Sequence, residues 1–209
     1  MSGSFSEPTA TQHEQLAAYA RLLKEFNRKI NLISRESEAE IDIRHIRHVL
    51  ALASKPFPSG SIVVDWGTGG GLPAIPLAIC FPDVTVHAVD SVGKKVHAVQ
   101  AMARRLGLTN LKAWHGRAEQ WPGRTHYSVS RATAPLVDLW TWHTRVAEPF
   151  FPPPDVEMWQ PGLICLKGGD LRAEIDELHL RHPDVGVTVT NLDSDSFEEK
   201  VIVEVANAT

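Results

Sequence analysis

Apolar residues recur at helical spacing near the start of the chain. Five of them lie three or four positions apart: Leu16, Ala20, Leu23, Phe26 and Ile30. This spacing places them on one face of an amphipathic helix. The segment Thr11–Glu14, just before them, has the spacing of a capping box. We therefore predict that a helix begins at this segment and that residues 1–10 precede it as a tail.

A second amphipathic segment indicates another helix, over about Ala39–Ala53. Its inward face is expected to carry Ile43, Ile46, Leu50 and Ala53. The following "SKPFPSGS" contains two prolines and a glycine, which interrupt helices and favour turns. We interpret residues 1–60 as an N-terminal helical cap on the domain formed by residues 61–209, not as an independent domain.

From Ser61 onward, short apolar runs alternate with helical segments. Strands are predicted at Ile62–Asp65, Val84–Asp90, Leu111–His115, Tyr127–Arg131 and Leu163–Lys167. Helices are predicted between them, beginning near Pro73, Val92, Pro135 and Leu171. Alternation of this kind is typical of an α/β fold with a parallel sheet that helices cover on both faces.

The C-terminal part of the chain breaks this alternation. Val185–Leu192 and Glu198–Ala206 are both predicted as strands, and the polar loop "DSDSF" joins them without a helix. Two strands joined in this way pair antiparallel. The sheet should therefore end in an antiparallel hairpin at one edge, which is not the six-stranded dinucleotide-binding architecture.

Composition and charge narrow the class of protein. With 209 residues, of which 43% are hydrophobic and 22% charged, the chain can bury a full core as one globular domain. The formal net charge is −4 and the pI is about 6.2. These values argue against a protein that binds nucleic acid through a global basic field, although local basic patches remain compatible with them.

The chain also lacks the marks of a membrane or secreted protein. No apolar run reaches the ~18–20 residues that span a bilayer, and the polar N-terminus has no apolar signal-peptide region. Cys80 and Cys165 both lie inside apolar runs, so a disulfide framework is not expected. We therefore predict a cytoplasmic protein without a membrane partner.

A glycine-rich turn joins the first predicted strand to the next helix. In "VVDWGTGGGLPAIPLAI", residues 63–79, four of the five positions from 67 to 71 are glycine. Glycines let a ligand approach the backbone closely, and so many of them cost too much chain entropy for a turn that only packs a helix on a sheet. Gly69, Gly71 and Ala74 formally match the dinucleotide pattern G-x-G-x-x-G/A, so a dinucleotide is one candidate ligand.

Two aspartates favour a different ligand. Asp65 precedes the glycines and would repel a pyrophosphate, whereas it would suit an ammonium group. Asp90 ends the next strand, where it can accept hydrogen bonds from both hydroxyls of a ribose. A ligand with a ribose, an amino-acid ammonium and no phosphate is S-adenosyl-L-methionine.

The sequence resembles a known family along nearly its whole length. The resemblance rests on ordered stretches: "FNRKINLIS", "HIRHVLALA", "DWGTGGGLPAIPLAI", "VDSVGKKVHAVQ", "GRAEQW", "VSRATAPL" and "LKGGDL". Together they resemble the GidB-type (RsmG) bacterial methyltransferases, which make 7-methylguanine in 16S small-subunit ribosomal RNA. The resemblance implies a class I methyltransferase (Rossmann-like) fold of seven strands, with residues 61–209 as the S-adenosyl-L-methionine-binding domain. It also implies 16S rRNA or the 30S subunit as partner.

The resemblance further implies a set of cofactor-binding residues. Carried over by position, these are Gly67, Gly69 and Leu72 at the methionine end, Asp90 and Ser91 by the ribose, Ala118 and Glu119 by the adenine, and Arg131 at the mouth. The chain departs from the family pattern at Trp66, at Ala74 and at His48-Val49, where many members have a small aliphatic residue, glycine and Asp-Ser.

The expected chemistry needs few catalytic groups. Guanine N7 carries a lone pair and no proton, so methyl transfer to it requires orientation but no general base. Arg131 is the catalytic candidate, since it follows the fourth strand and can offer two donors to guanine O6 or a phosphate. Lys167, after the fifth strand, is a second candidate for the same reason. No metal is expected, because His45 and His48 lack a carboxylate or cysteine partner.

Several features leave alternatives open. Basic residues that could follow RNA phosphates, or simply be solvated, are Arg21, Lys24, Arg28, Lys29, Lys94, Lys95, Arg104 and Arg105. Tryptophans that could stack on bases, or lie in the core, are Trp114, Trp121, Trp140 and Trp142.

The alternative functions are a class I methyltransferase acting on another RNA, a protein or a small molecule, and a dinucleotide-binding module without turnover. A monomer is expected.

Overall fold

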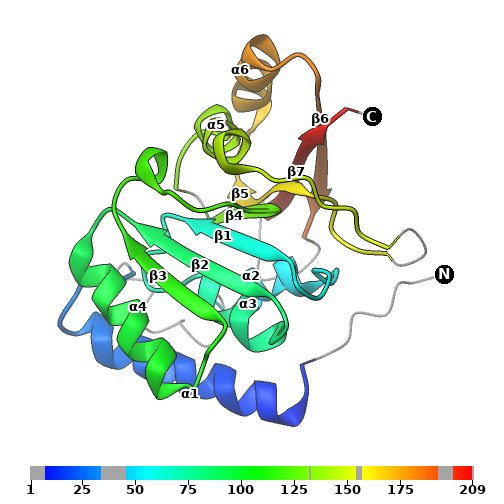
Figure 1. The fold of residues 1–209 in the computed structure, drawn as a ribbon. Helices are drawn as coiled ribbons and strands as arrows, with labels where there is room; N and C mark the ends of the chain where they lie inside the picture. Colours follow the sequence, from blue (N-terminus) through cyan, green and yellow to red (C-terminus); the bar gives the residue numbers. More distant parts are fainter. Residues whose placement is uncertain (1–7, 34–45, 132, 154–156, 193–199, 209) are drawn as a thin grey trace.

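The computed structural model describes residues 8–33, 46–131, 133–153, 157–192 and 200–208. A seven-stranded sheet runs through the middle of the molecule, in the order β3-β2-β1-β4-β5-β7-β6 (Figure 1). Its strands are β1 Ile62–Trp66, β2 Thr85–Asp90, β3 Leu111–His115, β4 Tyr127–Arg131, β5 Gly162–Gly168, β6 Val185–Asn191 and β7 Lys200–Asn207.

The pairing directions agree with the sequence pattern. The strands β1 to β5 pair parallel, whereas β7 pairs antiparallel with both β5 and β6. The α/β class and the antiparallel terminal hairpin are therefore confirmed. Because β7 lies between β5 and β6, the last strand of the chain is not at the edge, and β6 is. The "DSDSF" loop lies outside the described residues.

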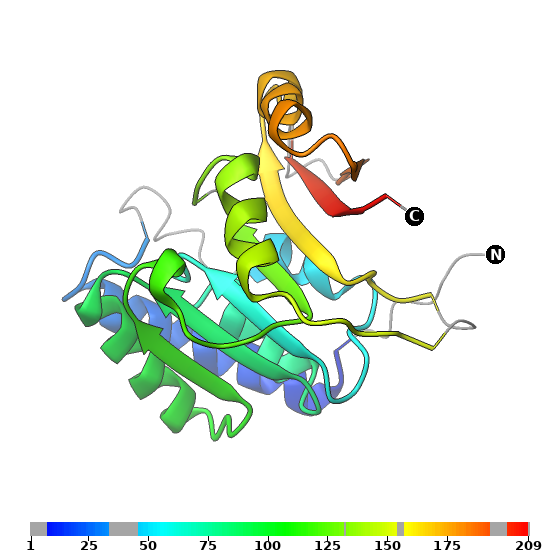
Figure 2. The same cartoon turned by 45° about the horizontal axis from the view of Figure 1, so that its top comes forward.

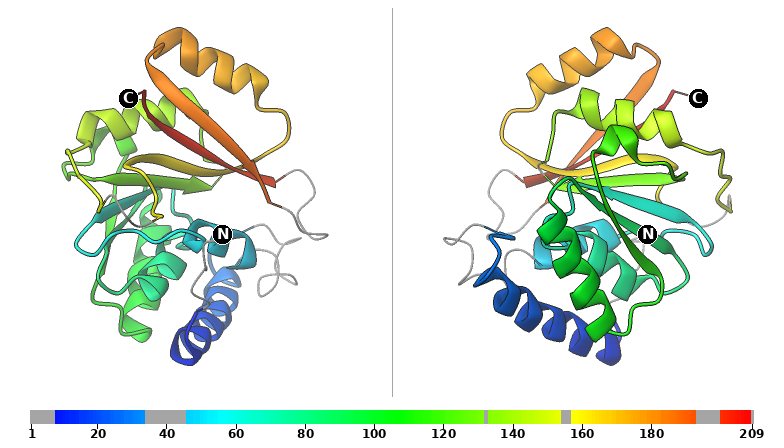
Figure 3. Two further views of the ribbon diagram at one scale, coloured as in Figure 1. Left: turned by 90° about the vertical axis from the view of Figure 1, so that its right-hand side faces the viewer. Right: turned by 60° about the vertical axis from the view of Figure 1, so that its left-hand side comes forward.

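Helices cover both faces of the sheet. They are α1 Ala10–Asn27, α2 Ile46–Leu50, η3 Ala51–Ala53, α3 Ala74–Cys80, α4 Gly93–Arg105, η4 Ala118–Gln120, α5 Leu136–Val146 and α6 Arg172–Arg181. Figure 2 and Figure 3 show α1, α3 and α4 on one side of the sheet and α5 and α6 on the other. Val63 contributes to the core under the first group and Val64 to the core under the second, as the alternation of side chains along a strand requires.

The first helix begins two residues earlier than the sequence indicates. Its capping box consists of Thr9 and Gln12, not of the segment Thr11–Glu14. The Thr9 hydroxyl accepts a hydrogen bond from the Gln12 amide, and the Gln12 side chain accepts one from the Thr9 amide. Glutamine serves this role as well as glutamate, so the spacing alone could not choose between the two boxes. The helix ends at Asn27, and Ile30 therefore packs on the core from the following turn.

The remaining boundaries differ little from expectation. The described part of the second predicted helix starts at Ile46 and ends as a turn of 3-10 helix, while residues 39–45 lie outside the described residues. The strand β2 starts at Thr85, one residue after the predicted Val84.

Hydrogen bonds join α1 to the C-terminal ends of α3 and α4. The Gln12 side chain donates hydrogen bonds to the carbonyl oxygens of Ile79 and Cys80, at the end of α3, over 3.1 and 3.0 Å. The Gln15 side chain donates to the carbonyl oxygen of Leu106, just after α4. These contacts satisfy carbonyl groups that the ends of helices leave unpaired. The described residues before Ser61, among them Leu23 and Val49, also share one hydrophobic core with Val63 of β1. Among the described residues, no helix is long and apolar enough to cross a membrane.

Candidate functional site

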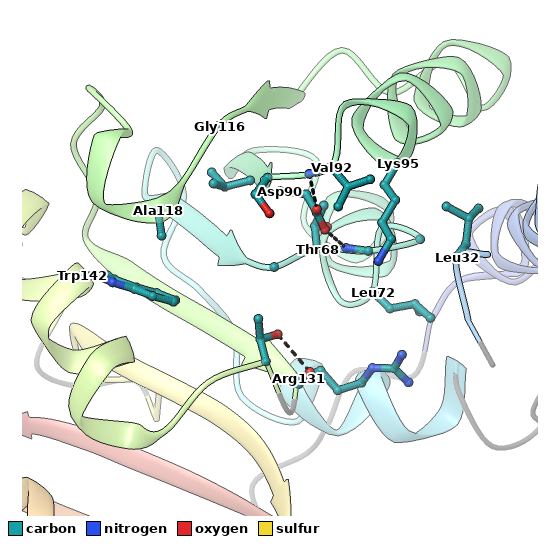
Figure 4. A pocket seen from close by; sticks show the side chains of 16 residues that line it. Leu32, Thr68, Leu72, Asp90, Val92, Lys95, Gly116, Ala118, Arg131 and Trp142 are labelled. Carbon is teal, nitrogen blue, oxygen red and sulfur yellow. Dashed lines mark hydrogen bonds between the residues drawn. The ribbon is translucent and has the colours of Figure 1, made fainter. Parts of the chain in front are cut away.

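A cavity of about 410 Å³ opens at the carboxyl ends of the parallel strands. Residues that end or directly follow β1, β2 and β4 line it, among them Gly67, Asp90 and Arg131. This is the edge where ligands bind in open α/β sheets, and the volume lies in the range of small-molecule sites. Figure 4 shows Asp90 in the middle of the cavity, with Ala118 and Trp142 on one side and Leu72, Lys95 and Leu32 on the other.

The glycine turn forms the floor of this cavity. Gly67 has a φ angle of +71° and Gly69 one of +56°, values that residues with a side chain rarely adopt. A Cβ atom on Gly67 would lie 2.1 Å from the Cγ2 atom of Thr133, so glycine is also needed there for packing. A Cβ atom on Gly69 would meet only the carbonyl oxygens of Leu32, at 3.6 Å, and Gly67, at 3.9 Å, both at ordinary van der Waals distance. The backbone of Gly69 is therefore open to a ligand.

Asp90 holds the glycine turn in place. Its carboxylate accepts hydrogen bonds from the Gly69 amide, over 2.9 Å, and from the Val92 amide, over 2.8 Å. The side chain thus joins the end of β2 to the turn and to the start of α4. Each carboxylate oxygen has two lone pairs, so both oxygens can still accept a further hydrogen bond from a ligand hydroxyl.

Asp65 is not in the cavity, which corrects the expectation that it faces a ligand ammonium. Its side chain is completely buried beneath the turn, and one oxygen accepts a hydrogen bond from the Ala74 amide over 3.1 Å. A carboxylate at this place caps the first turn of α3. Burial raises the pKa of Asp65 to about 7, although the neighbouring Thr68 hydroxyl, the Ala74 amide and Arg131 act in the opposite direction. Asp65 therefore shapes the turn from below.

This raised pKa predicts a pH-dependent effect of Asp65→Asn. The pKa is 3.8 in an ordinary aspartate and about 7 in the folded chain. At a pH between these two values, Asp65 is therefore protonated in the folded chain and ionised in the unfolded chain. The free energy of unfolding consequently falls as the pH rises through this window, by up to about 4 kcal/mol. Asparagine carries no charge and can still accept from the Ala74 amide. We expect the variant to be as stable as the parent at pH 4 and more stable at pH 8.

Thermal unfolding at the two pH values measures this effect in the ligand-free protein. Asp83→Asn serves as the control, because the Asp83 side chain is exposed at the opposite end of β2. Equal shifts in the melting temperature of Asp65→Asn at pH 4 and pH 8 would contradict the prediction.

Arg131 ends β4 and lines the cavity, half-buried. Burial lowers the pKa of its guanidinium, while the nearby Tyr19 and Asp65 act in the opposite direction. Tyr19 comes from α1, and its buried hydroxyl donates a hydrogen bond to the carbonyl oxygen of Gly70 over 3.0 Å. The N-terminal segment therefore supports both the glycine turn and the surroundings of Arg131.

Lys167 does not share the position of Arg131, contrary to expectation. It is buried outside the cavity lining, and its ammonium donates to the carbonyl oxygen of Ala134 and to Glu174, each over 2.7 Å. The same Glu174 oxygen accepts a hydrogen bond from the Leu136 amide, at the start of α5. Lys167 thus fixes the segment that follows Arg131 and does not face a ligand.

The far end of the cavity is aromatic. Ala118 lines it as expected, but the Glu119 side chain is exposed and is not part of the lining. Trp142, from α5, forms the wall beside Ala118. Its ring packs edge-on against Trp66, with ring centroids 6.1 Å apart. Trp66 is completely buried and also packs edge-on against Trp121, so this departure from the family pattern supports the wall from behind.

The cavity brings together seven of the eight cofactor residues inferred from the resemblance, all except Glu119. Nine further residues line the cavity that were not expected at the cofactor site: Leu32, Thr68, Gly70, Val89, Val92, Lys95, Gly116, Thr133 and Trp142. Four of the nine, Thr68, Gly70, Val89 and Val92, are direct neighbours of assigned residues in the sequence, which was an available signal. Leu32, Lys95 and Trp142 come from other elements and become neighbours only in the folded chain.

Several other residues considered for RNA binding or catalysis are engaged in ion pairs or buried in the core. Arg105, one of the basic residues considered for RNA phosphates, forms an ion pair with Glu25 over 2.9 Å. Burial raises the pKa of the Cys80 thiol to about 11 and that of Cys165 to about 12, so neither is a thiolate at neutral pH. Trp121 and Trp140 are buried in the core.

The histidine pair considered for a metal is only partly described. His48 is buried on α2, whereas His45 lies outside the described residues. Within the described ranges, no group of three or more His, Cys, Asp or Glu side chains is arranged to hold a metal ion.

Comparison with known proteins gives one family. The model of the family described as rRNA small subunit methyltransferase G (GidB) matches residues 12–150. The Ribosomal RNA small subunit methyltransferase G of Salinibacter ruber is 53% identical over 207 residues, which are 96% of this chain and 95% of that protein. The protein of the same name from Chlorobium limicola is 45% identical over 182 residues, 84% of this chain and 78% of that protein.

Solved structures share the fold at low sequence identity. The magnesium protoporphyrin IX methyltransferase of Synechocystis PCC 6803, solved with bound SAM, superposes with a TM-score of 0.62 at 14% identity. That match covers 91% of this chain and 97% of the other. A SAM-dependent methyltransferase from Aquifex aeolicus superposes with a TM-score of 0.56 at 17% identity, covering 83% of this chain and 98% of the other. The fold is thus that of the class I methyltransferases.

Proposed function

Since the chain belongs to the rRNA small subunit methyltransferase G family, we propose that it methylates N7 of a guanine in 16S rRNA with S-adenosyl-L-methionine. The observation that carries the proposal is the cavity itself. Its open glycine backbone, the Asp90 carboxylate and Arg131 meet at the carboxyl edge of a class I methyltransferase sheet. The rRNA substrate class comes from the relatives that carry this name.

The lining residues fit the cofactor from end to end. Gly67, Gly69 and Leu72 would hold the methionine part, and Asp90 with Ser91 would hold the ribose. Ala118 and Trp142 would enclose the adenine. Asp90 suits the ribose because its oxygens retain lone pairs after accepting two backbone amides. When bound, S-adenosyl-L-methionine supplies a methyl group on a positively charged sulfur.

The choice of guanine N7 is supported by what the lining side chains can do. The charged side chains among them are Asp90, Lys95 and Arg131, and Asp90 is already engaged by two backbone amides. Because N7 has a lone pair and no proton, methyl transfer to it asks only for orientation. Arg131 can present two donors to guanine O6 or to a phosphate and so hold the base at the mouth of the cavity.

We also propose a division of the chain into two parts. Residues 1–60 act as an N-terminal helical cap, and residues 61–209 as the S-adenosyl-L-methionine-binding domain. We further propose that the protein acts as a monomer in the cytoplasm, on 16S rRNA or on the 30S subunit.

Expression of the chain in a bacterial strain that lacks its own family member tests this function. The 16S rRNA is purified, digested to nucleosides and analysed by mass spectrometry, with the empty vector as control. We expect 7-methylguanosine to appear only when the chain is expressed. A new methylated nucleoside of another kind would contradict the choice of N7, and an unchanged nucleoside profile would contradict the rRNA substrate.

A further inference from the structure

Lys95 and its neighbour Lys94 have different surroundings in the folded chain. Both residues lie in the first turn of α4, and from the sequence both could contact RNA phosphates. The structure places Lys95 in the lining of the cofactor cavity, whereas Lys94 is exposed and is not part of the lining. Figure 4 shows the Lys95 side chain extending from α4 toward the glycine turn, at the end of the cavity where Leu72 and Leu32 lie.

The charge of Lys95 is not balanced by the protein around it. Across the described part of the chain, no carboxylate forms an ion pair with its ammonium, and no hydrogen bond joins the ammonium to another residue. The other charged lining side chains are occupied differently: Asp90 accepts two backbone amides, and Arg131 lies near Tyr19 and Asp65.

The position of Lys95 is also unfavourable for the helix. The first turn of α4 holds two lysines and no acidic residue, although the N-terminal end of a helix favours negative charge. A cation kept at such a place, inside a cavity and without a protein partner, indicates that a ligand supplies the balancing anion. Violations of local sequence preference of this kind occur at functional sites.

We propose that the Lys95 ammonium pairs with the carboxylate of the methionine part of the cofactor. The assignment rests on the cofactor orientation proposed above, in which Asp90 holds the ribose and Trp142 the adenine. In that orientation the amino-acid end lies over the glycine turn, on the side of the cavity that Lys95 enters. Lys95 is then the residue that selects a ligand with a free carboxylate, and Lys94 has no part in cofactor binding.

Two ligands and three variants test the proposal by titration calorimetry. The ligands are S-adenosylhomocysteine and its decarboxylated analogue, 5′-S-(3-aminopropyl)-5′-thioadenosine, which lacks only the carboxylate. We expect the parent protein to bind S-adenosylhomocysteine about tenfold more tightly than the analogue, the size of a charge-assisted pair. Lys95→Met should lose this preference while binding the analogue as the parent does, which also shows that the variant is folded. Lys95→Arg should retain most of the preference, and Lys94→Met all of it.

The outcomes separate this proposal from the one it rests on. A Lys95→Met protein that still prefers S-adenosylhomocysteine tenfold would overturn the role of Lys95. If that variant also lost activity on rRNA through a higher KM, Lys95 would be an RNA contact. A parent protein that binds neither ligand would overturn the assignment of S-adenosyl-L-methionine as the cofactor, and the role of Lys95 with it.

Discussion

Arg131→Ala is expected to lower the turnover number about 100-fold while changing the affinity for S-adenosylhomocysteine less than about threefold. The expectation follows from where the residue lies. Arg131 ends β4 at the cavity wall, whereas the groups assigned to the ribose and methionine parts come from β2 and the glycine turn. Its donors would act on the base at the mouth, so their loss removes orientation in the transition state and leaves cofactor contacts intact.

Arg131→Lys is the matched variant for this prediction. Lysine keeps the positive charge next to Asp65 and Tyr19 but lacks the planar pair of donors. Its turnover should therefore lie between those of the parent and the alanine variant. Methylation rates on 30S subunits and calorimetric titration with S-adenosylhomocysteine give the two numbers. If Arg131→Ala lost affinity and kept its turnover, Arg131 would be a cofactor contact only.

Asp90→Ala should weaken S-adenosylhomocysteine binding by about 100-fold or more. The substitution removes the acceptors proposed for the ribose hydroxyls. It also leaves the amides of Gly69 and Val92 without the carboxylate that they now share, so the glycine turn loses its support. Both effects act on the same ligand, which is why this variant is expected to have the largest effect on binding.

Asp83→Ala is the control for Asp90→Ala, because Asp83 lies exposed near the opposite end of β2. Its affinity should match that of the parent in the same titration. Circular dichroism of the Asp90→Ala protein checks that the sheet and helices persist. An Asp90→Ala protein that binds S-adenosylhomocysteine like the parent would refute the placement of the ribose.

The sheet was largely predictable because its signal is local. Parallel strands buried on both faces are continuous apolar runs, and the loss of the intervening helix after Val185 is enough to indicate a hairpin. The start of α1 was missed by two residues because Thr9 and Thr11 are equally good capping residues by type. What decides between them is the side chain of Gln12, which also reaches the end of α3.

The site was less predictable where a side chain could turn either way. Asp90 ends β2 and Asp65 lies one residue before the end of β1, yet only Asp90 lines the cavity, because Asp65 points beneath the turn to the Ala74 amide. The same holds for Arg131 and Lys167. Lys167 does not line the cavity because its ammonium donates a hydrogen bond to the Glu174 carboxylate. Trp142 and Lys95 could not be assigned from spacing, since α5 and α4 carry them to the cavity from separate parts of the chain.

Methyl transfer from radiolabelled S-adenosyl-L-methionine is the most direct test of the proposed guanine-N7 methylation. The purified protein is incubated with naked 16S rRNA and with 30S subunits, both from cells that lack their own family member, and the RNA is then digested to nucleosides. We expect to find the label in 7-methylguanosine from at least one of these substrates. Label in any other nucleoside, or no label from a protein that binds S-adenosylhomocysteine, would contradict it.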